Sequence, residues 1–232
     1  MDGYDSAEEE DVYEIIPSRD PASRRTLYSA KTRLRDQRTG EQFEFYGLFC
    51  SEQLHAGDFI AMYSGEWFHE DATDLTVEQN RYALSISAGL VIVPTLLNGA
   101  PDPALFPAAM GNEPMPGRHA NAMLVEWTFG RDQITGIPSD VSDTAFYGCG
   151  LVACCAIPRD TEIRWDYGAN YPRRLYHYER GLPCLNPVQG SIVGPQLPAQ
   201  YLGGVPFEAV SPLLEPPSVS SEEHSSDPDW EP

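Results

Sequence analysis

Residues 150–171 read GLVACCAIPRDTEIRWDYGANY, an apolar run that passes into a block of aromatic and charged residues. The last ten residues hold a tryptophan, two tyrosines, two carboxylates and a glycine, close to the end of the compact part of the chain. The apolar half predicts a strand over residues 146–156, because short apolar runs bounded by turn residues are typical of buried strands. This strand leads directly into the residues that carry groups suited to chemistry.

The rest of the compact region shows short strands separated by turn residues, without a sustained helical period. The sequence also predicts strands over residues 43–50, 58–63, 82–87, 90–95 and 122–128, and short helices within 69–80 and 101–110. The predicted fold class is therefore mainly β, with short strands in small sheets and few short helices. The sequence contains neither the glycine-rich fingerprint of a dinucleotide-binding fold nor a P-loop motif, which argues against both folds.

The chain of 232 residues has a net charge of -20, and most of this charge lies near its two ends. Residues 1–20 carry eight acids against Arg19 alone, and residues 186–232 carry seven acids and no lysine or arginine. We predict a disordered acidic tail over residues 1–24, one domain over 25–180, and a disordered tail rich in proline, serine and acids over 181–232. An acidic protein is repelled by nucleic acid backbones and attracted to basic partners, so we expect no direct nucleic-acid binding.

The sequence shows no sorting signal and no regular cysteine pattern. No apolar run is long enough to cross a membrane, and the acidic N-terminus lacks the basic and apolar regions of a signal peptide. We therefore expect an intracellular protein with no membrane partner. The five cysteines are too few and too irregularly spaced for a disulfide framework, and no cysteine or histidine spacing is typical of a metal site. We expect free thiols, no bound metal, and buried packing for Cys154 and Cys155.

Three blocks of the sequence, in this order, resemble the signature blocks of the SET-domain family of protein-lysine methyltransferases. The first block is residues 45–68, and its matching residues are Gly47, Gly57, Asp58, Phe59, Ile60, Tyr63, Gly65 and Glu66. The second is residues 108–124, where Asn112 and the pair Asn121-Ala122 match in part. The third is residues 150–171, and its matching residues are Ile157, Glu162, Ile163, Asp166, Tyr167 and Gly168. The likeness spans residues 43–171.

This resemblance implies a SET-domain β-clip fold, in which the C-terminal segment threads beneath an earlier loop to make a knot-like core. It implies S-adenosylmethionine as the cofactor and a basic protein or peptide, such as a histone tail, as the substrate. Nuclear residence follows from the resemblance only. The resemblance places Tyr167 in the channel where lysine meets the methyl donor, with Tyr82 and Tyr147 as candidate catalytic partners. The residues that it implies at the cofactor are Gly47, Leu48, Phe49, Tyr63, Asn112, Glu113, Asn121 and Tyr167.

The chemistry of methyl transfer to lysine explains why aromatic residues suit such a channel. A lysine amine has a pKa of about 10.4 and must lose its proton before it can attack a methyl group. A narrow aromatic channel beside a positively charged sulfonium lowers that pKa and aligns the reacting atoms. Tyrosine supplies both a wall and a hydroxyl, and aromatic faces attract methylated ammonium groups.

The chain departs from the family pattern in two places. The asparagine block continues with Glu113-Pro114 in place of His-Ser, and Asn121 comes nine positions after Asn112 rather than six. The cysteine cluster that follows many histone-directed members is not present, and residues 171–184 offer tyrosines and arginines, which we interpret as a helical lid or a basic surface segment. Two main hypotheses therefore remain: a protein-lysine N-methyltransferase, and a catalytically inactive SET-fold module that binds other proteins. A third alternative is a small β-rich protein whose likeness to the family is accidental.

Overall fold

The computed structural model describes residues 13–19, 25–35, 42–72, 74–87, 89–114, 117–129, 144–169, 171, 181–188 and 203–206. Its strands are β1 (Tyr13–Pro17), β2 (Leu27–Arg35), β3 (Gln42–Cys50), β4 (Phe59–Met62), β5 (Glu66–His69), β6 (Leu84–Ile86), β7 (Leu90–Val93), β8 (Leu96–Leu97), β9 (Ala100–Pro101), β10 (Ala122–Phe129), β11 (Thr144–Ala153), β12 (Glu162–Ile163) and β13 (Gly203–Pro206). The helices in this part of the chain are α1 (Val77–Tyr82) and the 3-10 helices η1 (Glu70–Ala72) and η2 (Pro107–Met110). The prediction of a mainly β chain with few short helices is confirmed.

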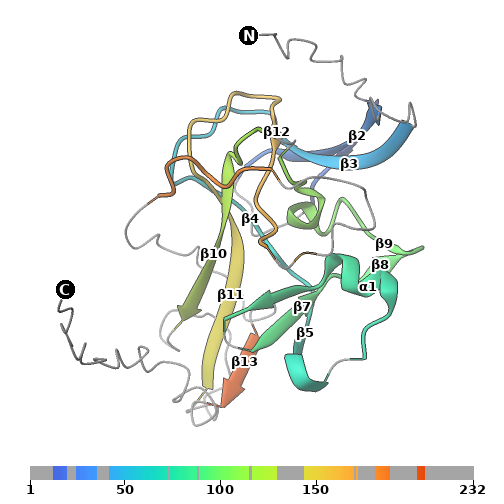
Figure 1. The fold of residues 1–232 in the computed structure, drawn as a ribbon, viewed down its shortest axis with the longest axis vertical. Helices are drawn as coiled ribbons and strands as arrows, with labels where there is room; N and C mark the ends of the chain where they lie inside the picture. The colour runs from blue at the N-terminus through green and yellow to red at the C-terminus, as the bar shows by residue number, and fades with distance from the viewer. Residues whose placement is uncertain are drawn as a thin grey trace, which may run out of the picture.

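The strands form small antiparallel sheets (Figure 1). One sheet has the order β1-β2-β3-β12, a second joins β10, β11 and β13 with β4 added to β11, and a third has the order β5-β7-β6. The long β10–β11 pair runs through the molecule between the β2–β3 pair and β13 (Figure 1). Within the described residues, no helix is long and apolar enough to span a membrane.

Each predicted strand coincides at least in part with an observed one. The predicted strands 43–50, 58–63, 82–87, 90–95, 122–128 and 146–156 correspond to β3, β4, β6, β7, β10 and β11. The helices expected within 69–80 and 101–110 correspond to η1 with α1 and to η2. These elements were predictable because each carries its own apolar pattern or turn signal.

Tyr82 lies at the end of α1 and not in a strand, which corrects the predicted strand over residues 82–87. A capping box starts this helix: the Gln79 amide donates to the Thr76 hydroxyl at 3.2 Å, and the Thr76 amide donates to the Gln79 side chain at 3.0 Å. Such reciprocal bonds satisfy amides at a helix start and favour the helix over an extended chain. The strand β6 therefore begins only at Leu84.

Two strands lie in regions that the sequence assigned to disordered tails. β1 pairs with residues 28–31 of β2, and β13 pairs with residues 144–147 of β11. Local amino-acid composition does not reveal such pairing partners, because a strand at the edge of a sheet is stabilised by a segment that is distant in sequence. The boundaries of the domain and of the two tails stay a prediction, and residues 1–12, 20–24, 189–202 and 207–232 lie outside the described part of the chain.

The core lies where β3, β4, β11 and β12 meet. Leu48, Ile60, Leu151 and Ile163 come from these four strands and are fully buried. Gly150 lets β4 approach β11 closely, since a Cβ at this position would lie 2.6 Å from the Ala61 carbonyl oxygen. The core thereby brings the third sequence block against the first.

Candidate functional site

The short segment 162–165 is hydrogen-bonded to three other parts of the chain. As β12, its residues Glu162 and Ile163 pair with Phe49 and Leu48 of β3. Beyond β12, the Trp165 amide donates to the Asn112 carbonyl at 2.9 Å, and the amides of residues 121 and 122 donate to the Arg164 carbonyl at 3.0 Å. Both ends of the loop 112–122, described at residues 112–114 and 117–122 and hereafter the site loop, are thus hydrogen-bonded to one later segment, and we call this meeting point the crossing.

A buried polar network fills this crossing. The side-chain amide of Asn112 donates to the Glu162 carboxylate at 2.7 Å and to the Tyr46 carbonyl at 3.0 Å. The Arg164 guanidinium forms an ion pair with the same carboxylate, with Nε 2.8 Å from Oε2. The Glu162 side chain is only 5% exposed, and a carboxylate at this depth is stable only when charge and hydrogen bonds compensate its lost hydration.

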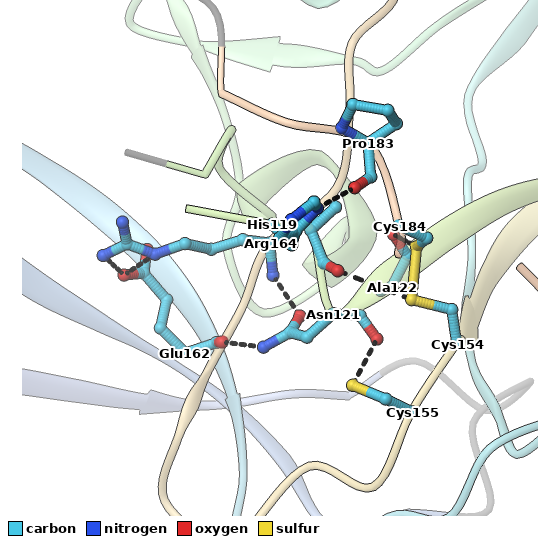
Figure 2. The surroundings of a disulfide bond; sticks show 10 residues. His119, Asn121, Ala122, Cys154, Cys155, Glu162, Arg164, Pro183 and Cys184 are labelled. Carbon is cyan, nitrogen blue, oxygen red and sulfur yellow. Dashed lines mark hydrogen bonds and ion pairs between the residues drawn. A yellow bond between two sulfur atoms is a disulfide. The ribbon is translucent and has the colours of Figure 1, made fainter. Parts of the chain in front are cut away.

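Asn121 closes the same network from the other side (Figure 2). Its side-chain amide donates to the Glu162 carbonyl at 2.8 Å, and its side-chain oxygen accepts from the Arg164 backbone amide at 2.8 Å. Asn112 and Asn121, which the resemblance placed at the cofactor, therefore both hold the chain crossing together through their side chains.

Gly47, Leu48 and Phe49 lie in β3 beside this network. A Cβ at position 47 would lie 2.7 Å from the Glu162 carboxylate, so the glycine is needed for the close approach of a protein side chain. Leu48 is fully buried, and Phe49 stacks on Tyr28 with ring centroids 5.3 Å apart. In the structure these three residues contact neighbouring strands.

Four aromatic side chains pack beside the crossing and are called the aromatic cluster: Tyr63, Trp165, Tyr167 and Tyr171. Ring centroids are 6.3 Å apart for Tyr63 and Trp165, 4.8 Å for Trp165 and Tyr167, and 4.7 Å for Tyr167 and Tyr171. The tilted and edge-to-face angles are those that aromatic quadrupoles favour. The cluster joins the first and third sequence blocks into one wall.

The carbonyl of Gly111 anchors two rings of this cluster. The Tyr167 hydroxyl donates to it at 2.7 Å, and the Trp165 indole nitrogen donates at 3.0 Å. A Cβ at position 111 would lie 3.1 Å from the Trp165 ring, so a larger residue there would push against the indole. Glu113 adds a further contact, because its carboxylate accepts from the Tyr167 backbone amide at 3.3 Å.

Burial determines the protonation state of the tyrosines in the cluster. It raises the pKa of Tyr167 well above the usual 10.0, and the neighbouring Tyr171 and Tyr63 and the carboxylates of Glu113 and Glu162 raise it further. Burial likewise raises the pKa of Tyr63, whose hydroxyl donates to the Tyr82 carbonyl at 2.6 Å. Both phenols therefore stay protonated at neutral pH and act as hydrogen-bond donors.

The structure places the two other candidate tyrosines differently. Tyr82 contacts the aromatic cluster through its backbone carbonyl, which accepts from Tyr63. Tyr147 is buried in β11, its hydroxyl has no hydrogen-bond partner within the described residues, and burial raises its pKa. Trp165 and Arg164 were missed as site residues, although both lie inside the conspicuous stretch EIRW.

A disulfide joins Cys154 to Cys184, which contradicts the prediction of free thiols for these two residues (Figure 2). The other cysteines keep free thiols, buried for Cys50 and Cys149 and exposed for Cys155. The predicted burial of Cys154 and Cys155 thus holds for Cys154 alone. Spacing in sequence could not foresee the bond, because the fold brings the end of β11 against residues 181–188. The described residues contain no group of three or more potential metal ligands.

The predicted lid over residues 171–184 is described only at its two ends. Tyr171 belongs to the aromatic cluster, and its hydroxyl lies 3.5 Å from the Arg81 carbonyl of α1. Residues 172–180, which include Tyr176 and Tyr178, lie outside the described residues. The choice between a helical lid and a surface segment stays a prediction.

Comparison of the chain with protein-family models and with curated proteins finds no match. Among solved structures it is similar to a candidate histone methyltransferase from Plasmodium falciparum, at 13% identity and a TM-score of 0.33, over 61% of this chain and 95% of that one. It is also similar to KRYPTONITE in complex with mCHH DNA, an H3(1-15) peptide and SAH, at 16% identity and a TM-score of 0.34, over 63% of this chain and 24% of that one. A humanized mutant of the Chaetomium thermophilum Polycomb Repressive Complex 2, bound to an inhibitor, matches at 17% identity and a TM-score of 0.37, over 71% of this chain and 20% of that one.

Proposed function

We propose that this chain is an S-adenosylmethionine-dependent protein-lysine N-methyltransferase that acts on a histone tail or another basic protein. The observation that carries the proposal is the pair of hydrogen bonds from Asn112, which reach Tyr46 in the first sequence block and Glu162 in the third. Three stretches that resemble one family in sequence, and in the same order, are thereby packed around a single residue. The aromatic cluster lies next to that residue, as a lysine channel would require.

The aromatic cluster suits a cationic substrate. Aromatic faces attract ammonium groups, and the carboxylates of Glu113 and Glu162 lie close enough to influence Tyr167 electrostatically. A wall of this kind accepts a lysine side chain, and its burial favours the neutral amine that methyl transfer requires. The net charge of -20 draws basic proteins toward the chain, which favours a histone-like substrate and, with it, nuclear residence.

Tyr167 serves in this proposal as a wall and a hydrogen-bond donor, and not as a general base. Its raised pKa keeps the phenol protonated, so it cannot accept the proton that the lysine loses. Its hydroxyl is directed to the Gly111 carbonyl at 2.7 Å and locks the ring in place. The proton therefore leaves to water before the amine attacks.

The chemistry of the site fits the cationic part of S-adenosylmethionine. The bound cofactor would supply a methyl group on a sulfonium sulfur, and the aromatic cluster with Glu113 would surround that positive charge. The side-chain bonds of Asn112 and Asn121 lie inside the protein, so recognition of the rest of the cofactor would fall to backbone groups of the site loop and β3.

The alternative function is a SET-fold module that binds proteins without turnover. The observation that favours it is that the polar groups of the network bond to one another. The side chains of Asn112 and Asn121 both donate to Glu162, and the Asn121 side-chain oxygen accepts from the Arg164 amide. The space beside Gly47 is likewise filled by the Glu162 carboxylate. These residues already have a structural role, and such a role needs no cofactor.

Calorimetric titration with S-adenosylmethionine, together with methyl transfer to core histones, tests the proposal. Tyr167→Phe is the matched variant, since it keeps the ring and removes only the hydroxyl. We expect the wild type to bind the cofactor and to transfer its methyl group. The variant should bind the cofactor but transfer the methyl group about 100-fold more slowly, because a ring without its hydrogen bond no longer aligns the reacting atoms. If the folded wild type does not bind S-adenosylmethionine at millimolar concentration, the proposal of an enzyme is contradicted. The alternative of a protein-binding module would then remain.

A further inference from the structure

We propose that the disulfide between Cys154 and Cys184 is a redox-sensitive latch on the site loop. In the oxidised state it holds residues 181–184, hereafter the strap, against residues 112–122. Reduction releases the strap and loosens the loop. The latch depends on the oxidation state of these two sulfurs, whether or not the chain transfers methyl groups.

The strap lies along the site loop in the oxidised state. The Ala120 amide donates to the Leu182 carbonyl, and the Leu182 amide donates to the Arg118 carbonyl, both at 2.8 Å. The His119 ring lies 2.8 Å from the Pro183 carbonyl oxygen (Figure 2). The strap thus covers the middle of the loop with backbone contacts.

Gly181 brings the strap unusually close to the other side of the loop. A Cβ at this position would lie 2.3 Å from the Pro114 carbonyl oxygen, so no other residue fits without a backbone shift. Pro114 and Ala120 lie on opposite arms of the loop, and the strap contacts both. Holding the strap therefore also holds the two arms of the loop in place.

Apart from these hydrogen bonds and the close packing of Gly181, little besides the disulfide fastens the strap. Gly181 has no side chain to bury, Leu182 is 40% exposed, and Leu185 just beyond is 70% exposed. A segment with so little apolar burial and a few surface hydrogen bonds opens easily, since ordering its backbone costs entropy that these contacts barely offset. The covalent bond to Cys154, which is buried at the end of β11, supplies the missing constraint.

The latch also reaches the polar network of the site. The Cys154 amide donates to the Asn121 carbonyl at 2.9 Å, and the Asn121 amide donates to the Arg164 carbonyl at 3.0 Å. Asn121 thus lies between the disulfide and the Glu162–Arg164 pair (Figure 2). A loosened loop end at Asn121 would remove bonds from Arg164 and relax the crossing on that side.

A dithiol reductant is the chemical class that would open the latch. One of its thiolates attacks the sulfur of the partly exposed Cys184, a mixed disulfide forms, and the Cys154 sulfur leaves as a thiolate and takes a proton. The second thiol of the reductant then displaces the Cys184 thiol. Two electrons and two protons pass from the dithiol to the protein, and the reductant leaves as a disulfide.

Hydrogen exchange by mass spectrometry on the full chain tests the latch, with thiol labelling to count free cysteines. The samples are the air-oxidised protein, the same protein in dithiothreitol, and the variants Cys184→Ala and Cys155→Ala. Cys155→Ala is the matched control, because Cys155 adjoins Cys154 in sequence but keeps a free, exposed thiol. Circular dichroism in each state reports whether the β fold persists.

When the protein is unfolded before labelling, so that the buried Cys50 and Cys149 also react, we expect three labelled thiols in the oxidised protein and five in the reduced one. Reduction is expected to speed exchange at the amides of residues 120–122 and 182 at least tenfold more than at the amides of β2 and β3. Cys184→Ala should show this fast pattern without reductant, and Cys155→Ala should behave as the wild type. Five labelled thiols in the air-oxidised protein, an equal change at all amides, or no change on reduction would each overturn the latch.

Discussion

The side-chain amide of Asn112 donates to the Glu162 carboxylate at 2.7 Å, across 50 residues of sequence. The Glu162 carboxylate also accepts a hydrogen bond from the Arg164 guanidinium and lies against Gly47. One buried carboxylate thus connects β3, the site loop and β12. The aromatic cluster follows directly on the same segment, since Trp165 and Tyr167 come just after Glu162.

Replacing Asn112 with alanine is expected to lower the free energy of unfolding by about 1–3 kcal/mol, because the Tyr46 carbonyl and the Glu162 carboxylate each lose a donor in a buried site. Urea denaturation measures the change. Asn80→Ala is the control, since Asn80 is exposed on α1 and its side chain donates a long hydrogen bond of 3.5 Å to the Leu75 carbonyl. Equal stability of the two variants would show that the Asn112 bonds contribute nothing.

A methyl group at Gly47 is expected to clash with a carboxylate that cannot move away. A Cβ at this position would lie 2.7 Å from a Glu162 oxygen that Asn112 and Arg164 hold in place. We expect Gly47→Ala to cost about 1–3 kcal/mol in the free energy of unfolding. The cost should shrink by about 0.5 kcal/mol or more in a Glu162→Asp background, where the carboxylate is one methylene shorter. Strict additivity in this double-mutant cycle would refute the clash.

The Gly111 carbonyl should tolerate the loss of one donor but not of two. It accepts from both Trp165 and Tyr167, so each of Trp165→Phe and Tyr167→Phe leaves one hydrogen bond. We expect the loss of the Tyr167 hydroxyl alone to cost about 1 kcal/mol. The double variant should cost at least about 0.5 kcal/mol more than the sum of the single ones, because it leaves a buried carbonyl unpaired. Thermal or urea unfolding of the four proteins measures this, and a sum without excess would argue against the shared acceptor.

Alkaline pH is expected to weaken the fold through Tyr28. Burial, together with the hydrogen bond to Asp160, raises the pKa of this residue from 10.0 to about 12. The unfolded chain therefore releases the phenol proton first, so the stabilising contribution is complete below pH 10.0 and is lost as the pH rises toward 12. Urea denaturation should show that the stability advantage of the wild type over Tyr28→Phe falls between about pH 10 and about pH 12. An advantage that stays constant over this range would contradict the raised pKa.

Local sequence patterns were sufficient for much of the fold. The runs FEFYGLFC and AMLVEWT, at residues 43–50 and 122–128, are dense in aromatic and branched apolar residues and form β3 and β10. Such segments carry their own strand signal, because side chains of this kind pack well on a pleated surface. The crowded block at residues 162–171 was likewise a sound guide, since it supplies both β12 and most of the aromatic cluster.

Interactions between distant residues were beyond the reach of those patterns. The strand β12 has only two residues, and β1 and β13 lie in acidic or proline-rich surroundings, so each exists because a partner strand is present. Tyr82 was placed in a strand, because the capping box at Thr76 that draws it into α1 is a weaker signal than the apolar run after it.

The sequence by itself determined the mainly β class and the order of the blocks, because these depend on residue type and local spacing. The role of Tyr167 stays a prediction that rests on the family resemblance. Only the tertiary structure decided that Asn112 and Asn121 hold the crossing, that Glu162 lies against Gly47, and that Cys154 bonds to Cys184. Each of these is a contact between residues far apart in the chain. Such contacts depend on how the sheets pack, and packing is a property of the whole fold and not of any one segment.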